Sequence, residues 1–233
     1  MPIPFHLSIC RSSLLVALIA WPPSSGTTAH TELLPTLSPA VALDPPLPGG
    51  SLLRVGLERF KGWNRVRRFL VDPENDRFAE LRPWLTWAHT LRELPAQKRL
   101  AAINARVDAS IFYADDEVVW HRPDYWETPL EVVRKGRTDC EGYVILKMFL
   151  AIAAGIDSKA MAVVVGRVPD RRIFHAVLIV RLGTVRYLLD NQPAAAEIGR
   201  LVDFEPIYAV DLARAWSFPA SPTPSAPYIV ATP

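Results

Sequence analysis

The sequence of 233 residues predicts an α+β fold in which a helical N-terminal part packs on an antiparallel sheet. Between residues 57 and 155, apolar residues recur every three or four positions, as they do in amphipathic helices. After residue 159, three short segments are rich in Val, Ile and Leu, which is typical of strands. Half of the residues are hydrophobic and the formal net charge is +2, so one domain can bury a real core and nothing indicates a nucleic-acid partner.

The two ends of the chain are expected to lie outside the folded domain. Residues 1–29 contain an apolar run after an early arginine, followed by small residues, which is the pattern of a secretory signal peptide. An uncleaved N-terminal anchor is the alternative. Prolines crowd residues 30–50 and 219–233, which predicts a linker and a tail. The domain is therefore expected at residues 51–218, in a protein exported to the periplasm.

Helices are expected in order along the first part of the domain. An amphipathic helix with a basic face covers residues 57–70, and most of residues 82–130 is also expected to be helical. Residues 120–129 form an aromatic loop, after which a short helix stops at Gly136. A central helix with a buried face then runs from Cys140 to Gly155.

Three strands are expected after the central helix, at residues 160–165, 173–180 and 185–189. A turn around Leu182 and Gly183 joins the last two as a hairpin. In the register that this turn sets, His175 lies opposite Asp190, and cross-strand partners have Cβ atoms about 4.5–5.5 Å apart. An imidazole and a carboxylate are therefore expected to meet.

Cys140 is the candidate nucleophile. If the signal peptide is removed with Cys10, no other cysteine is left in an oxidising compartment, so no internal disulfide can form. Thr138 and Glu141 match the pattern of a capping box, which places Cys140 in the first turn of the central helix. Backbone N–H groups and the helix dipole favour an anion there, so we expect a lowered thiol pKa. The alternative is a buried, inert cysteine.

Cys140, His175 and Asp190 together predict thiol-dependent acyl transfer. Cys140 would be the nucleophile, His175 the base, and Asp190 the group that orients the imidazole. The alternative for His175 is a histidine that only packs in the core. The alternative for Asp190 is a residue in a turn that ends a strand. The sequence does not separate water from an amine as the acyl acceptor, so a protease and a transglutaminase or other acyltransferase both fit. A non-catalytic binding module with a degenerate site is a third class.

Four motifs in this order resemble those of a known family: Tyr125-Trp126-Glu127-Thr128-Pro129, Asp139-Cys140-Glu141, His175-Ala176-Val177-Leu178 and Leu189-Asp190-Asn191. They are similar to those of the bacterial transglutaminase-like cysteine proteinases, which include the LapG-type periplasmic proteases. The resemblance runs from about Trp63 to Trp216. Cysteine, histidine and aspartate in this order also suit true transglutaminases and arylamine acyltransferases.

The resemblance implies a papain-like, transglutaminase-like α+β fold with a catalytic triad of Cys140, His175 and Asp190. It implies a periplasmic cysteine endopeptidase that cleaves the N-terminal region of a large surface adhesin and so controls biofilm release. It also implies a partner, an inner-membrane cyclic-di-GMP receptor that inhibits the protease by sequestering it.

Calcium is the metal that the resemblance implies, with Asp139 and Glu141 as candidate ligands. The family pattern has aspartate after the glutamate, where this chain has Gly142, so one expected ligand is missing. Calcium takes six to eight oxygens, so this loss would weaken the site unless another oxygen replaces it. Residues 115–117 are acidic and could supply oxygens, although an exposed acidic turn is their default explanation.

Overall fold

The computed structural model describes residues 47, 53–72, 74–168, 173–192, 196–197, 200–201, 204–218 and 228–229. The expected signal peptide lies outside these residues, as do most of the expected linker and tail. Leu47, from the expected linker, is fully buried in an apolar cluster against the sheet. Among the described residues, no helix has the length and apolar character needed to cross a membrane.

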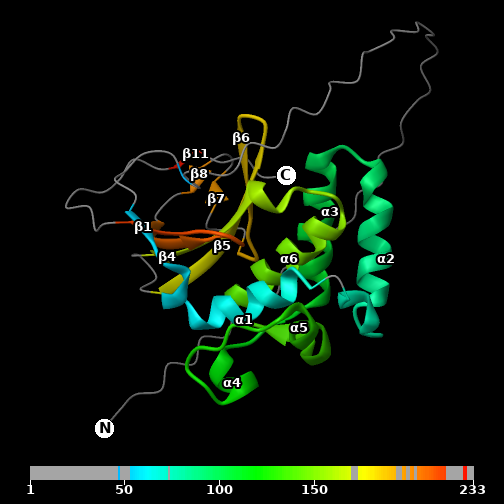
Figure 1. Cartoon of the computed structure of the whole chain (residues 1–233), viewed down its shortest axis with the longest axis horizontal. Coiled ribbons are helices and arrows are strands. Elements are labelled where there is room, and N and C mark those ends of the chain that lie inside the picture. The colour runs from blue at the N-terminus through cyan, green and yellow to red at the C-terminus, as the bar shows by residue number, and fades with distance from the viewer. Residues whose placement is uncertain are drawn as a thin grey trace, which may run out of the picture. The chain divides into compact units, whose positions relative to one another are not determined.

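Helices fill the first half of the described chain, as the apolar periodicity predicts (Figure 1). They are α1 (Lys61–Leu70), α2 (Arg82–Thr90), α3 (Ala96–Ser110), α4 (Asp116–Trp120), α5 (Pro129–Lys135) and α6 (Cys140–Ala153). Short 3-10 helices are η1 (Leu57–Arg59), η2 (Asn75–Arg77), η3 (Leu91–Glu93) and η4 (Ser158–Ala160).

The strands form one main antiparallel sheet, in the order β1-β10-β9-β4-β5-β6. Their bounds are β1 (Leu53–Val55), β4 (Met161–Val168), β5 (Ile173–Leu182), β6 (Val185–Leu189), β9 (Glu205–Val210) and β10 (Ala215–Ser217). A small parallel pair joins β2 (Phe112–Tyr113) to β3 (Arg137–Thr138). A second small sheet joins β7 (Ala196–Glu197), β8 (Arg200–Leu201) and β11 (Tyr228–Ile229), the last of which falls in the expected tail.

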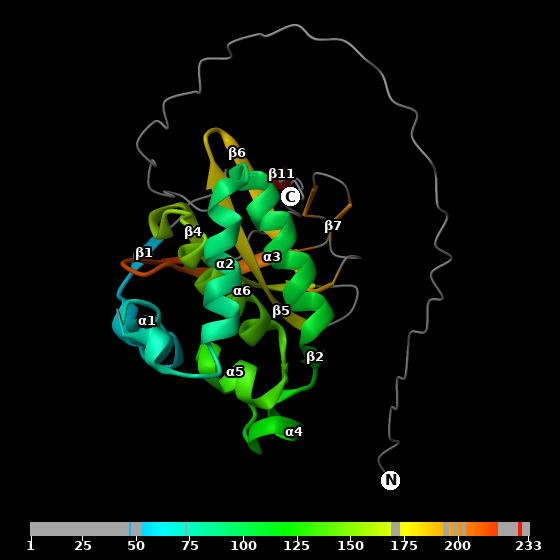
Figure 2. The same cartoon turned by 90° about the vertical axis from the view of Figure 1, so that its right-hand side faces the viewer.

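The central helix is α6, which lies between the main sheet and the pair α2 and α3 (Figures 1 and 2). Nearly all of its side chains are buried, and it packs against β5 on one side and α2, α3 and α5 on the others. An apolar helix of this kind is expected in the middle of a domain rather than on its surface. The α+β arrangement predicted from the sequence is confirmed.

The short helix before α6, α5, ends at Gly136 as its sequence predicts. Thr128 is its N-cap, and the hydroxyl of Thr128 and the carboxylate of Glu131 form a capping box. Gly136 ends the helix with a φ of 64°, a left-handed conformation that glycine adopts without strain. This stop directs the chain through β3 to the start of α6.

The hairpin of β5 and β6 has a different register from the expected one. Leu178 pairs with Leu189, a shift of two residues, because the turn is at Gly183 and the residue after it. Side chains alternate between the faces of a sheet, so a shift of two residues leaves each on its predicted face. His175 and Asp190 therefore share a face, and they meet diagonally rather than directly opposite each other.

Candidate active site

Cys140 is the first residue of α6, and it is buried. Asp139 is the N-cap, and its carboxylate accepts a hydrogen bond of 3.2 Å from the backbone N–H of Glu141. The expected capping box with Thr138 is wrong, because Thr138 lies in β3 and its hydroxyl donates to Glu127 at 2.8 Å. The thiol still lies in the first turn, since aspartate serves as an N-cap as well as threonine does.

The surroundings of Cys140 favour the protonated thiol. Burial raises the pKa of Cys140 well above its ordinary value, and the charges of Glu141 and Asp139 raise it further. The thiol donates a hydrogen bond to a Glu141 carboxylate oxygen 2.9 Å away, which also raises the pKa. A hydrogen bond with the Ala176 backbone lowers it. The expected lowering of this pKa is therefore wrong in this structure, because burial and two carboxylates outweigh the helix N-terminus.

His175 and Asp190 are in direct contact. Nε2 of His175 lies 2.7 Å from Oδ1 of Asp190, and both side chains are buried. When Nε2 donates its proton to the carboxylate, Nδ1 is the ring nitrogen that can accept one. Ala176, the next residue in β5, interacts through its backbone with Cys140. His175 and Asp190 therefore form a contact pair, and the residue that follows His175 interacts with Cys140 where β5 meets the start of α6.

An ion pair between a buried lysine and a half-buried aspartate, next to this group, was not expected from the sequence. Nζ of Lys147, a fully buried residue of α6, lies 2.6 Å from Oδ1 of Asp108 in α3. Burial lowers the pKa of Lys147, and the charges of Asp108 and Asp190 raise it. A lysine within an apolar helical face is the sequence signal for such a pair, because a buried ammonium needs a counter-charge.

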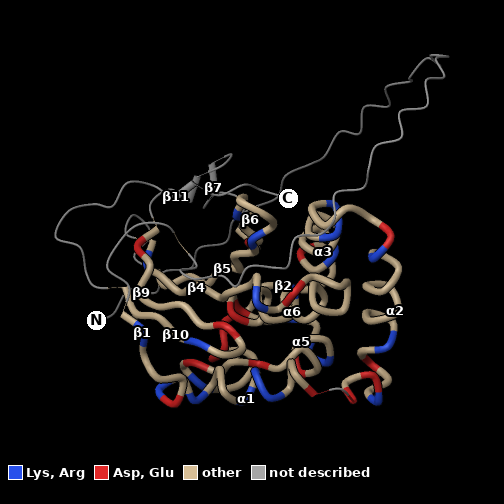
Figure 3. Tube along the Cα trace, turned by 45° about the horizontal axis from the view of Figure 1, so that its top comes forward, with Lys and Arg blue, Asp and Glu red and all other residues tan. Residues whose placement is uncertain are grey.

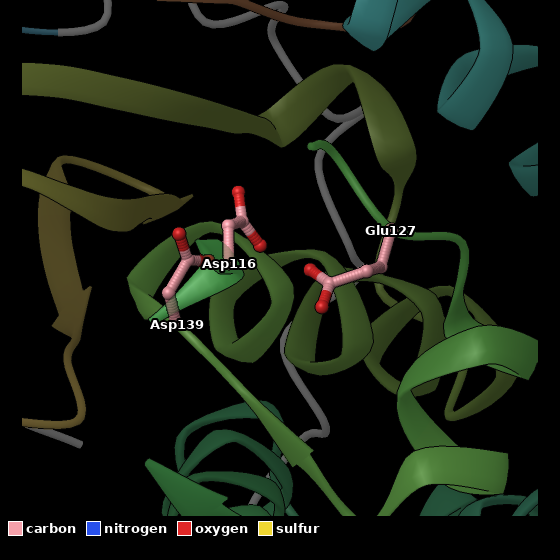
Figure 4. A group of neighbouring side chains, drawn as sticks. All are labelled: Asp116, Glu127 and Asp139. Carbon is pink, nitrogen blue, oxygen red and sulfur yellow. The ribbon is translucent and has the colours of Figure 1, made fainter. Parts of the chain in front are cut away.

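Three carboxylates converge beside Cys140. Oxygens of Asp116, Glu127 and Asp139 all lie within 4.8 Å of one another, and the carboxyl group of Glu127 points toward the other two (Figure 4). They come from α4, from the loop before α5 and from the N-cap of α6. We call them the carboxylate cluster.

Burial is the main reason that the cluster resists ionisation. It raises the pKa of Asp116 to about 6 and that of Glu127 to about 7, and neighbouring carboxylates add to both shifts. The pKa of Asp139 rises further for the same reasons. Oδ1 of Asp116 is buried without a hydrogen-bond partner among the described residues. Several carboxylate oxygens, one of them unpaired, fit a hard cation such as calcium.

The cluster changes the candidate metal ligands. Asp139 belongs to it, whereas the Glu141 carboxylate accepts the hydrogen bond from Cys140. The view of residues 115–117 as an exposed turn is wrong for Asp116, which is 4% exposed. Glu127 is fully buried in the aromatic loop, where a lone carboxylate among apolar residues is the signal that could have identified it.

Gly142 faces this cluster and has no room for a side chain. A Cβ atom there would lie 1.8 Å from Oγ1 of Thr138 and 2.8 Å from Oε2 of Glu127. The position where the family pattern has an aspartate is thus filled by the threonine hydroxyl and the Glu127 carboxylate. An aspartate at position 142 would therefore overlap both groups.

Comparison with known proteins points to one family. A model of the bacterial transglutaminase-like cysteine proteinases, BTLCP, matches residues 88–204. No curated protein matches the chain in sequence. Among solved structures, Legionella pneumophila LapG aligns with a TM-score of 0.51 and 20% identity, over 66% of this chain and 86% of that chain. The calcium-bound LapG of the same organism gives a TM-score of 0.50 and 20% identity, over 73% of this chain and 92% of that chain. The EGTA-treated form of LapG from this organism gives a TM-score of 0.50 and 19% identity, over 71% of this chain and 89% of that chain.

Proposed function

The chain belongs to the bacterial transglutaminase-like cysteine proteinase family, and from this we propose that it is a periplasmic cysteine endopeptidase. The observation that carries the proposal is the buried contact of 2.7 Å between His175 and Asp190, next to the first turn of α6. That turn holds Cys140, so α6 would supply the nucleophile, β5 the base, and the residue directly after β6 the orienting carboxylate.

In the proposed mechanism, Cys140 transfers its proton to Nδ1 of His175, and the sulfur attacks the carbonyl carbon of the scissile peptide bond. The C–N bond breaks, and the leaving amine takes the proton from His175, which leaves a thioester. A water molecule then gives a proton to His175 while its oxygen attacks the thioester carbon; the C–S bond breaks, the acid leaves, and the Cys140 sulfur takes the proton back from His175. Asp190 keeps the imidazole in the tautomer that accepts the proton.

Calcium is the cation that we propose for the carboxylate cluster. Asp116, Glu127 and Asp139 would hold it, and Glu141 is the nearby candidate for a further oxygen. The unpaired buried oxygen of Asp116 and the raised pKa values of the cluster support this assignment. A bound calcium ion would supply positive charge beside Cys140 and so reduce the free-energy cost of a thiolate.

The proposed substrate is the N-terminal region of a large surface adhesin, whose cleavage would release cells from a biofilm. The proposed partner is an inner-membrane cyclic-di-GMP receptor that inhibits the protease by sequestering it. Both proposals rest on the resemblance to LapG-type proteases and require an exported protein. Fractionation of cells that express the full chain tests export, and recovery in the cytoplasm alone would contradict it.

The decisive experiment incubates the purified protein with N-terminal fragments of adhesins encoded in the same genome. We expect cleavage that is abolished by Cys140→Ala and by a calcium chelator, and restored when calcium is added back. Cleavage that survives Cys140→Ala would refute the proposed nucleophile. Cleavage that needs the thiol but tolerates the chelator would refute only the calcium proposal.

An amine in place of water would make the same thioester chemistry an acyl transfer. Incubation with substrate and a labelled primary amine separates the two outcomes by product mass. Hydrolysis adds one water molecule across the cleaved bond, whereas transfer joins the label to the new carboxyl end. We expect hydrolysis, and efficient incorporation of the label would make the protein an acyltransferase.

A further inference from the structure

A cleft with a volume of about 540 Å³ is lined by basic and aromatic residues. This volume lies within the range of ordinary ligand sites and would hold several peptide residues. The lining comes from η1, from the start of α1, from the loop between α4 and α5, and from β9. Its residues are Arg59, Phe60, Lys61, Gly62, Trp63, Arg65, Arg122, Asp124, Tyr125, Trp126 and Tyr208. We call this the basic cleft.

The basic cleft adjoins the candidate active site. Tyr208, which lines it, lies close enough to Glu141 and Cys140 for their charges to raise its pKa, after the larger effect of burial. The pKa of Asp124 is raised mainly by burial and then by the charge of Glu141. Trp126, also in the lining, directly precedes Glu127 of the carboxylate cluster. In the sheet, Tyr208 pairs with Val165, and Val165 pairs with Ala176, whose backbone interacts with Cys140. Neighbouring strands are about 4.8 Å apart, so a peptide bound across Cys140 reaches the cleft after about 10 Å.

The charges of the lining are predominantly positive. It contains four cationic side chains and one carboxylate. Arg65 pairs with Glu131 at 2.8 Å, but Arg59, Lys61 and Arg122 form no ion pair with the described residues. All three are exposed at the rim, and Figure 3 shows Lys and Arg distributed along α1.

The ring of Tyr125 contacts two of these cationic side chains. The guanidinium groups of Arg65 and Arg122 lie 4.6 Å and 5.0 Å from the centre of the Tyr125 ring. The carboxylate of Glu131 accepts hydrogen bonds from Arg65 and from the Tyr125 hydroxyl. Arginine side chains held in this way lose little side-chain entropy when they bind a ligand, which favours binding.

We propose that the basic cleft binds the substrate chain on one side of the scissile bond and selects acidic side chains there. This inference rests on the proposed endopeptidase function, because it treats the cleft as part of the substrate site. Glutamate and aspartate fit it because guanidinium groups pair with carboxylates. The rings of Phe60, Tyr125 and Trp126 would contact the apolar parts of the bound peptide.

Binding is tested without catalysis, in the full chain that carries Cys140→Ala. The probes are blocked hexapeptides of alanine in which two residues are both glutamate, both glutamine or both lysine. Calorimetry at low and high salt gives the Kd of each. We expect the glutamate peptide to bind about tenfold more tightly than the glutamine peptide, because two carboxylates each gain a modest ion-pair energy. The advantage should shrink as salt is added.

Charge reversal in the cleft should remove that preference. Arg59→Glu combined with Arg122→Glu is expected to make the glutamate peptide bind no better than the glutamine peptide. The matched control combines Arg68→Glu with Lys98→Glu, which changes the net charge equally at exposed positions outside the cleft. The control should keep the preference. An equal loss in both variants would overturn the proposal, because it would show a general effect of net charge.

Cleavage of a peptide mixture from a digested proteome adds a second readout. The wild-type chain should cut sequences enriched in acidic residues at a fixed position relative to the cut, and the cleft variant should lose that enrichment. Cutting without such a preference, together with equal binding of the glutamate and glutamine peptides, refutes the cleft and leaves the protease standing. Tight binding of the glutamate peptide without any cutting supports the cleft as an acidic-peptide site and refutes the protease.

Discussion

Raising the pH is expected to destabilise the calcium-free protein, because the carboxylate cluster holds protons in the folded chain. The pKa of Asp116 rises from 3.8 to about 6 and that of Glu127 from 4.5 to about 7. The folded state therefore binds more protons than the unfolded state between about pH 4 and pH 7. The stabilisation is complete below the unfolded pKa values and is lost as the pH rises through the folded ones. Asp139, with a higher pKa, extends the loss to more alkaline pH.

The size of the effect follows from these shifts. The pKa of each group rises by about two units, and one unit corresponds to about 1.4 kcal/mol, so each alone contributes at most roughly 3 kcal/mol, and less where solvent screens the charge. The charge of Asp116 contributes to the shift of Glu127, so the two are not independent and we expect about 3–5 kcal/mol in total. For a domain of this size, that lowers Tm by about 10 °C. Glu131 does not offset the loss, since its pKa is lowered and it changes stability only in the acid range.

Thermal unfolding with a chelator at several pH values between 5 and 8 measures this loss, and the same series with excess calcium is the comparison. Calcium should raise Tm most at pH 8, where the carboxylates would otherwise repel each other. Glu127→Gln should flatten the slope measured with the chelator, because it removes one of the carboxyl groups that titrate in this range. A Tm that stays constant from pH 5 to pH 8 with the chelator, or that calcium leaves unchanged at pH 8, would refute the reasoning.

Three substitutions test other parts of the structure. Asp108→Asn should lower the free energy of unfolding in urea by about 3–5 kcal/mol, because it leaves the buried Lys147 without a counter-charge. Adding Lys147→Met should recover much of the loss. Equal stability of the single variant and wild type would contradict this. Gly142→Ala should lower the free energy of unfolding by about 1–3 kcal/mol in thermal unfolding, since the added Cβ overlaps the Thr138 hydroxyl. A gain in stability would mean that the higher helix propensity of alanine outweighs the overlap. Asp190→Asn should lower kcat/KM by about 10²–10⁴ in peptide cleavage while near-ultraviolet circular dichroism stays unchanged, and undiminished activity would remove Asp190 from the mechanism.

The elements of the fold are readable from the sequence because their signals are local. The stop at Gly136 depends on one residue that adopts a left-handed conformation, and the central helix depends on apolar spacing within its own residues. The centre of the hairpin turn is less determined, because Gly183 fits more than one position of a tight turn. The resulting error was two residues, so His175 and Asp190 kept their common face.

The chemistry of the site was harder to predict, because it depends on groups that are distant in the sequence. The position of Cys140 in the first turn follows from the local pattern, but its pKa depends on burial and on the sum of nearby charges. Asp116 and Glu127 gave no spacing signal, since they come from different elements that only the fold brings together. Their burial, which makes them chemically unusual, is a tertiary property.

At position 142 the space for an expected ligand is taken by residues from elsewhere in the chain. The family pattern has a carboxylate at this position, so its absence predicts a weakened calcium site. In the structure, however, Oε2 of Glu127 lies 2.8 Å from where a Cβ of residue 142 would be, and Thr138 occupies the remaining space. A cation responds to the oxygens around it and not to their order in the chain. Restoring the motif by Gly142→Asp should therefore disrupt the cluster by displacing Thr138 and Glu127, and weaken calcium binding rather than strengthen it.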